Sequence, residues 1–324
     1  MAENRDPSVA IVGATGIVGN QLIELIGARG IALGELKLFA TESGAAGTVS
    51  GVGEESLVEV LTSPEDLRGF DIVFLALPAP RAAEIVAANP GPKLIDLSAA
   101  TQQPSEVALF APGLTPRAQI EARRSETVFA VPHPVAHTLA ICLSAVGSLA
   151  RSIGATAMIG ASGAGKLGIE ATVKQTTDLL GAQLDLEDEE TQRGFNIFMR
   201  ESERALAAAI SAQTAALCSG APLIALQIVA VPVLHGTGLT IEIPSEGDGD
   251  ALIEHLRAAP GLLVQEAGEP LAVIDAVGQE AIIVSVDRVP GGIAIWCVFD
   301  NARLAALDAL WIAESLALNP ATLA

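Results

Sequence analysis

Three glycines near the N-terminus, Gly13, Gly16 and Gly19, have a spacing that suits the binding of phosphate groups. The apolar run at residues 9–12 before them is rich in β-branched residues and too short for a helix, which is typical of a buried parallel strand. After the turn, apolar residues recur at helical spacing. A strand, a glycine-rich turn and a helix N-terminus present unpaired backbone N–H groups, which suit a pyrophosphate. The predicted dinucleotide-binding residues are Gly13, Ala14, Thr15, Gly16, Ile17 and Val18.

The glycine spacing leaves one alternative open. It reads G-x-x-G-x-x-G, which is one residue longer in its first gap than the common dinucleotide fingerprint. Glycines at this spacing also occur where a helix simply packs closely against a strand. A purely structural turn is therefore the alternative to a nucleotide site.

Glu42 and Ser43 follow the predicted second strand, residues 35–40, where this kind of fold meets the adenosine ribose. A carboxylate at this place accepts a hydrogen bond from the ribose 2′-hydroxyl and repels a 2′-phosphate. Glu42 therefore favours NAD over NADP if its side chain points inward. A solvated glutamate in a turn is the alternative interpretation.

Cysteines and histidines are scattered and have no metal-ligand spacing. Cys142, Cys218 and Cys297 each lie among apolar residues, which is typical of small buried side chains. His133 and His137 lie close to each other, and such a pair either belongs to a helix start or forms a proton-transfer site.

Composition narrows the classes of partner. The chain has 324 residues, 50% of them hydrophobic, which predicts two domains with a large core. Its net charge of −20 argues against nucleic acids and anionic membrane surfaces as partners. No apolar stretch approaches the ~18 residues of a membrane span, and the N-terminus lacks the apolar region of a signal peptide. We therefore expect a cytoplasmic protein.

Strands and helices alternate in the first part of the chain, which predicts an α/β fold with a doubly wound parallel sheet. The later part has two long helices and then mostly strands, which predicts an α+β domain whose sheet can pair two subunits. The final helix, residues 301–318, is expected to return to the first domain. The predicted domains are residues 1–131 with 301–324, which bind the dinucleotide, and residues 132–300. Further predicted strands are residues 70–77, 93–97, 127–131, 155–161, 226–233, 238–243, 281–287 and 292–298, and predicted helices are 79–88, 137–153, 168–180 and 201–217.

Several short runs, taken in order and spacing, carry a resemblance to a known family. They are Gly13-Ala14-Thr15-Gly16-Ile17-Val18-Gly19, Ile95-Asp96-Leu97-Ser98-Ala99-Ala100, Ser162-Gly163-Ala164-Gly165, Phe195-Asn196-Ile197-Phe198, Val231-Pro232-Val233 and Asp300-Asn301. Across nearly its whole length the chain resembles aspartate-β-semialdehyde dehydrogenases. The resemblance implies a Rossmann-type domain, a substrate and dimerisation domain, a homodimer, and NAD or NADP as cofactor. It also implies that Ser162, Gly163 and Asn301 contact the cofactor.

In that family a cysteine thiolate attacks an aldehyde, hydride passes to the nicotinamide, and phosphate attacks the resulting thioester. The cysteine ends an Asn-Pro-Asn-Cys run, and the matching run here ends at Pro134, which has no nucleophile. The acid/base histidine of the family matches Thr237, and the arginine that binds the substrate carboxylate matches Ala230. The phosphate-binding arginine matches Gln102, and a site glutamine matches Ile159.

A Glu-x-x-Lys-like pair of the family is retained as Glu201 and Arg204, one helical turn apart. The same pair is also an ordinary i,i+3 ion pair of an exposed helix. Cys142 lies two helical turns beyond Pro134 and is expected to point into the core. Glu201, Arg204 and His133 are thus the candidates for a remaining catalytic role.

Three functions follow from this pattern. The first is a non-catalytic paralogue, which resembles a cysteine-lacking branch of the family. Such a paralogue would be a dimeric protein with a dinucleotide-binding or regulatory role. The second is an active NAD(P)-dependent semialdehyde dehydrogenase of amino-acid biosynthesis with an altered site around His133 and His137. The third is a subunit that pairs with a complete paralogue and tunes it.

Overall fold

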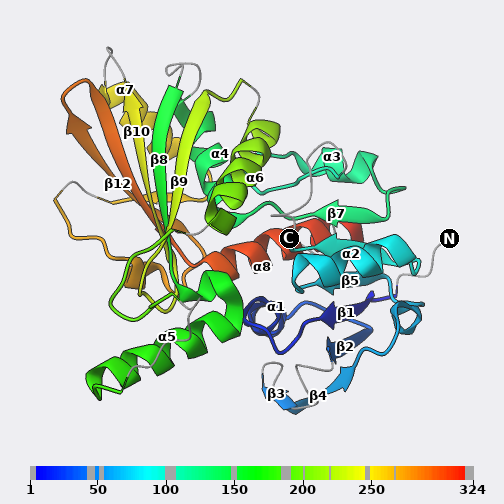
Figure 1. Ribbon diagram of the computed structural model, residues 1–324. Helices are drawn as coiled ribbons and strands as arrows, with labels where there is room; N and C mark the ends of the chain where they lie inside the picture. Colours follow the sequence, from blue (N-terminus) through cyan, green and yellow to red (C-terminus); the bar gives the residue numbers. More distant parts are fainter. Residues whose placement is uncertain are drawn as a thin grey trace. The chain divides into compact units, whose positions relative to one another are not determined.

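A computed structural model of the chain describes residues 5–41, 48–50, 55–98, 107–146, 152–183, 191–199, 201–218, 220–244, 249–265 and 268–317 (Figure 1). The chain divides into two compact units. Unit 1 comprises Met1–His133 and Ala305–Ala324, and unit 2 comprises Pro134–Leu304. No helix in the described part of the chain is both long and apolar enough to cross a membrane.

Unit 1 is built on a seven-stranded sheet with the order β3-β4-β2-β1-β5-β6-β7. All neighbouring strands run parallel except β3 and β4, which pair antiparallel at the edge. The predicted doubly wound parallel sheet is therefore confirmed. The strands are β1 (Ser8–Val12), β2 (Glu35–Ala40), β3 (Thr48–Ser50), β4 (Glu55–Val60), β5 (Ile72–Leu75), β6 (Lys93–Asp96) and β7 (Val128–Ala130).

The core of unit 1 surrounds the central strand β1, which is buried along its whole length. Its apolar side chains pack with those of helix α1, such as Leu22, and with Leu310 of the final helix α8. The final helix therefore contributes to the first unit, as the sequence predicts. The helices are α1 (Ile17–Ala28), α2 (Ala79–Ala88), α3 (Arg117–Ala122) and α8 (Asn301–Ala317), with a 3₁₀ turn at Pro64–Leu67.

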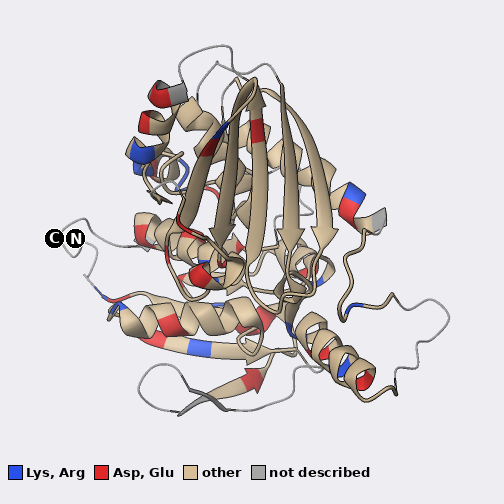
Figure 2. Cartoon of the chain, turned by 90° about the vertical axis from the view of Figure 1, so that its left-hand side faces the viewer, with Lys and Arg blue, Asp and Glu red and all other residues tan. Residues whose placement is uncertain are grey.

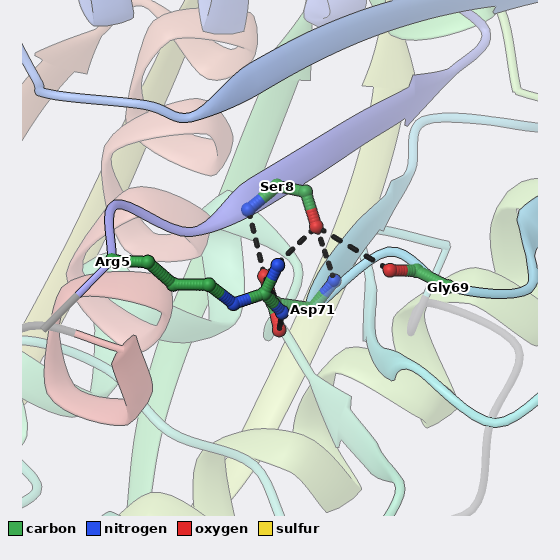
Figure 3. Close-up of polar contacts among 4 residues, drawn as sticks. All are labelled: Arg5, Ser8, Gly69 and Asp71. Carbon is green, nitrogen blue, oxygen red and sulfur yellow. Dashed lines mark hydrogen bonds and ion pairs between the residues drawn. The ribbon is translucent and has the colours of Figure 1, made fainter. Parts of the chain in front are cut away.

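Polar contacts join the N-terminal ends of β1 and β5, opposite the glycine turn (Figure 3). The Ser8 N–H and hydroxyl both donate to Oδ2 of Asp71 at 2.8 Å, and Nη2 of Arg5 lies 2.9 Å from Oδ1. Burial alone raises the pKa of Asp71, but the Ser8 hydrogen bonds and the Arg5 charge outweigh it and lower that pKa below its ordinary value. The cluster fixes the start of two adjacent strands.

Unit 2 contains a six-stranded sheet with the order β11-β12-β13-β10-β8-β9. Helices α4, α6 and α7 lie over one face, and Figure 2 shows the other face without a helix over it. The strands are β8 (Ser152–Ile159), β9 (Leu223–Ala230), β10 (Thr237–Pro244), β11 (Leu262–Val264), β12 (Ile282–Val289) and β13 (Gly292–Phe299). The helices are α4 (Pro134–Val146), α5 (Gly165–Leu180), α6 (Glu201–Leu217) and α7 (Gly249–Ala258).

Several predicted boundaries in unit 2 are wrong, and three elements illustrate this. The helix predicted at 137–153 begins at Pro134 and ends at Val146, because proline is well tolerated in the first turn of a helix. The strand predicted at 155–161 is β8, which begins at Ser152 and ends at Ile159. The strand predicted at 226–233 is β9, which ends at Ala230 shortly before Pro232, a residue without the N–H that a ladder needs.

Candidate functional site

The glycine turn after β1 is closely packed at its first and third glycines. Gly13 has φ of 92°, and a Cβ atom there would lie 2.2 Å from the carbonyl oxygen of Ala76. A Cβ on Gly19 would lie 2.2 Å from the carbonyl oxygen of Gly13. Both positions therefore require glycine so that α1 can approach β1 closely.

Gly16 differs, because the nearest atom to a Cβ built there is 3.2 Å away. It is the N-cap of α1, and no side chain caps this helix or places an acidic group in its first turn. The first N–H groups of the helix, at Ile17 and Val18, have no partner within the described part of the chain. Uncapped N–H groups at a helix N-terminus are chemically suited to a pyrophosphate, and binding at this turn stays a prediction.

Glu42, Ser43 and Gln102, which the sequence assigns to the ribose and to phosphate, lie outside the described residues. The preference for NAD over NADP therefore stays a prediction.

Three positions that match catalytic residues of the resembled family lie side by side in unit 2. Ile159, at the end of β8, pairs directly with Ala230 of β9 and with Thr237 of β10. Directly paired residues project from the same face of a sheet, so the three side chains form one row. An alanine, an isoleucine and a threonine supply neither a guanidinium nor an imidazole.

Thr237 carries a feature that the sequence did not indicate. Its side chain is 1% exposed, and its hydroxyl has no hydrogen-bond partner among the residues that the structure describes. An unpaired buried hydroxyl costs roughly 1–3 kcal/mol. Only the tertiary structure shows this, because the strand sequence does not say which threonines find partners.

The loop after β8 brings Ser162 and Asn301 together. The Ser162 hydroxyl donates to Oδ1 of Asn301 at 2.9 Å, and Oδ1 of Asp300 accepts from the N–H groups of Ala302 and Arg303 at 3.1 Å each. Two of the predicted cofactor contacts therefore form one fixed pair.

Gly163, the remaining predicted contact in this loop, has a packing requirement. A Cβ atom there would lie 2.3 Å from Cγ2 of Ile159.

Pro134 begins α4, and its carbonyl oxygen accepts a 2.9 Å hydrogen bond from the Thr138 hydroxyl. The preceding His133 is half-buried, and desolvation lowers its pKa from 6.5 to about 4. Its imidazole is therefore neutral near pH 7 and a weak base, which makes it a poor substitute for a catalytic histidine.

The cysteines offer no nucleophile within this site. All three are buried, and the Sγ atoms of Cys142 and Cys297 lie 3.9 Å apart between α4 and β13. The hydrogen bond with Cys142, together with burial, raises the pKa of the Cys297 thiol well above its ordinary value. The predicted core positions of the cysteines are confirmed.

Glu201 and Arg204 lie in the first turn of α6, as predicted, and Arg204 is exposed. The side chain of Glu201 lies outside the described part of the structure. No cluster of three or more His, Cys, Asp or Glu side chains able to hold a metal occurs in the described ranges.

Comparisons with known proteins show which proteins this chain is similar to in sequence and in fold. Residues 8–122 match the family model described as the NAD-binding domain of semialdehyde dehydrogenases. A USG-1 protein homolog of Pseudomonas aeruginosa is 31% identical, with 95% of this chain and 97% of the relative covered. An aspartate-semialdehyde dehydrogenase of Synechocystis is 27% identical, with 95% and 96% covered. The solved structure of a probable aspartate-semialdehyde dehydrogenase from Pseudomonas aeruginosa is 26% identical, covers 98% of this chain and 100% of its own, and has a TM-score of 0.83.

Proposed function

Because the chain belongs to the aspartate-semialdehyde dehydrogenase family, we propose that it is a dinucleotide-binding member whose thiol-dependent oxidation of the semialdehyde is lost. The observation that carries this proposal is the row of Ala230, Ile159 and Thr237 on adjacent strands. These side chains provide no guanidinium for a carboxylate and no group that exchanges protons near neutral pH. Pro134, which the resemblance matches to the family's cysteine, begins helix α4 and has no nucleophile.

The expected decrease in the rate of semialdehyde oxidation is large enough to amount to a loss of activity. Removing a covalent nucleophile from a set of cooperating residues costs on the order of 10⁴–10⁶ in rate. Removing an arginine that pairs with a substrate anion costs roughly 2–5 kcal/mol in addition. The buried thiols of Cys142 and Cys297 are no replacement, because both are shielded from a substrate and burial raises the pKa of the Cys297 thiol.

The cofactor proposal rests on the glycine turn of unit 1, where the N-terminus of α1 would hold the pyrophosphate. The contacts of Ser162 and Asn301 with the cofactor are proposed on the family resemblance alone. A bound nicotinamide supplies a hydride acceptor, and the residues of this chain would bind and orient it. We propose NAD as the preferred form, on the basis of Glu42.

We further propose a homodimer in the cytoplasm, formed through the open face of the six-stranded sheet in unit 2. Half-buried side chains lie on that face, among them Thr156, Thr240 and Trp296, which pair directly across β8, β10 and β13. Such a homodimer would bind a dinucleotide without catalysing a reaction. Alternatively, one subunit of this chain would pair with a catalytically complete paralogue and regulate the activity of that paralogue.

An enzyme assay together with calorimetry tests the proposal. The protein is mixed with aspartate semialdehyde, phosphate and either NAD or NADP, with the Synechocystis relative as a positive control. We expect saturable binding of NAD without appreciable reduction of it. Turnover within about a hundredfold of an ordinary enzyme, roughly 1–10³ s⁻¹, would instead establish an active dehydrogenase with an altered site.

A further inference from the structure

Strand β9 is one of the two edge strands of the sheet in unit 2, and within the described part of the chain only one end of its outer edge is covered. At that end Phe198 forms an antiparallel bridge with Ala230. The Ala230 N–H donates to Phe198 O at 2.9 Å, and the Phe198 N–H donates to Ala230 O at 3.2 Å. The backbone groups of Ala230 therefore point away from β8.

Other residues of β9 also direct their backbone N–H and C=O groups away from β8. In a β-strand the N–H and C=O groups of every second residue point to the same side. Ile228, Leu226 and Ile224 therefore direct their backbone groups outward, as Ala230 does. Within the described residues these groups have no hydrogen-bond partner on the outer edge.

A groove of about 560 Å³ runs along this edge between β9 and α6. The wall that α6 provides is made of small side chains, Ala207, Ala208 and Ser211, which leave room beside the strand. Glu203 and Arg204 are the charged residues of the lining and have opposite signs. A volume of this size is ordinary for a ligand groove.

The edge also lacks the features that usually prevent strand addition. Residues Leu223–Ala230 include no charged residue and no proline, and the Leu223 side chain is 80% exposed. Edge strands that must stay unpaired normally carry charges, prolines or bulges.

We propose that the outer edge of β9 binds an extended, uncharged peptide segment, which adds as an antiparallel strand beside Ile224–Ile228. The segment would continue along the line that Phe198 begins and would place large apolar side chains against Ala207, Ala208 and Ser211. Main-chain hydrogen bonds to Leu226 and Ile228 would supply affinity, as in other cases of strand addition. A neutral segment fits because the lining charges cancel and the net charge of −20 repels acidic partners.

A single peptide strand fits this edge better than a second copy of the chain does. Helix α6 lies beside β9, as Figure 1 shows, and its residues from Glu203 to Ser211 bound the groove on one side. A second copy paired edge to edge would bring its own α6 to the same side of the extended sheet. Because α6 bounds the groove in each copy, the two helices would compete for the space over the joined edge, and packed helices need about 8–10 Å between their axes.

Binding of a defined probe tests the proposal. The probe is the unlabelled, uncharged peptide acetyl-Ser-Val-Thr-Leu-Thr-Val-Ser-amide, with binding measured by calorimetry, and its control carries N-methyl groups on alternate amides. We expect saturable binding of the first peptide only, with slower hydrogen exchange at the amides of Leu226 and Ile228. Leu226→Pro removes an outward N–H without removing a bond to β8, and we expect it to weaken binding ~10-fold or more.

A second pair of variants guards against an effect of Leu226→Pro on folding. Ala208→Trp fills the groove and is expected to weaken binding to a similar extent, whereas Ala216→Trp, exposed on the same helix outside the lining, leaves it unchanged. The proposal fails if the probe does not bind, if the N-methylated peptide binds equally well, or if Ala208→Trp has no effect. Self-association that Leu226→Pro abolishes would also overturn it, because the occupant would then be a second copy.

Discussion

Ile159 and Thr237 lie directly opposite each other on strands β8 and β10, so their side chains leave the same face of the sheet. Ala230 extends this row onto β9. Three positions that the resemblance matches to site residues are thus adjacent in the sheet, and the side chains there carry no guanidinium and no imidazole. A geometry of this kind predicts that activity returns when the side chains are replaced.

The first prediction is a gain of function. A variant with Pro134→Cys, Ile159→Gln, Ala230→Arg, Thr237→His and Gln102→Arg is expected to reduce NAD with aspartate semialdehyde and phosphate. The rate should exceed that of the unmodified chain by at least ~10²-fold, because the nucleophile and its partners act as a set. The matched control keeps Pro134 and carries the other four changes. Equal activity in that control would show that the thiol is not what the unmodified chain lacks.

The second prediction separates two glycines of one turn. Gly16→Ala is expected to disturb the fold far less than Gly13→Ala, because its Cβ would lie 3.2 Å from the Gly13 carbonyl oxygen, a tight contact that a small shift relieves. It should weaken NAD binding by ~10-fold or more in calorimetry, since the methyl group would occupy space beside the helix N-terminus. Gly13→Ala is expected to unfold the protein or lower its melting temperature strongly, because its Cβ would meet the Ala76 carbonyl.

A third glycine provides the control for that comparison. Gly30 has φ of 59° and open space around it, and Gly30→Asn suits this backbone conformation. NAD affinity and melting temperature should both stay close to those of the unmodified chain. If Gly16→Ala binds NAD normally, the turn is structural and the cofactor proposal is wrong.

The third prediction concerns His133 and acid. Its pKa is about 4 in the folded chain, against an ordinary 6.5, so the unfolded chain binds more protons between these values. The free energy of unfolding should therefore fall as pH decreases from about 6.5 to about 4, by on the order of 1–3 kcal/mol. His133→Gln should remove this part of the pH dependence in urea unfolding curves. An unchanged dependence in that variant would mean that other groups cause it.

The fourth prediction tests the dimer. Thr156→Glu places a charge on the open face of the sheet, where in a symmetric dimer it would meet uncharged side chains or its own counterpart. Light scattering should show a dimer for the unmodified chain and a monomer for the variant. Ala216→Glu, on the exposed side of α6, is the control and should remain dimeric. A monomeric unmodified chain, or a dimeric Thr156→Glu variant, would refute an interface at this face.

Sequence periodicity located the main elements well, because long amphipathic helices and buried strands have strong patterns. The predicted strand at 35–40 and helices at 79–88 and 201–217 coincide with β2, α2 and α6. The short strands β3 and β11 were not predicted, since three residues are too few to show a period.

The same limit applies to the site. The glycine turn was readable locally, because its chemistry depends on consecutive residues. The pairing of Ile159 with Ala230 and Thr237, and the unpaired Thr237 hydroxyl, depend on strand register between distant segments. Register is set by the whole sheet, so a single sequence does not reveal it.

The last prediction concerns Asp71, whose carboxylate accepts from Ser8 and pairs with Arg5. Because its folded pKa is lowered, the stability it contributes is present above the unfolded value near pH 3.9 and is lost as pH falls through the folded pKa. Asp71→Asn should lower the free energy of unfolding by about 1 kcal/mol at pH 7 and flatten the acid limb of the curve. Glu84→Gln, which breaks an exposed pair with Arg81, should change it by less than about 0.5 kcal/mol. Equal effects of the two substitutions would show that the link between β1 and β5 adds no more than a surface ion pair.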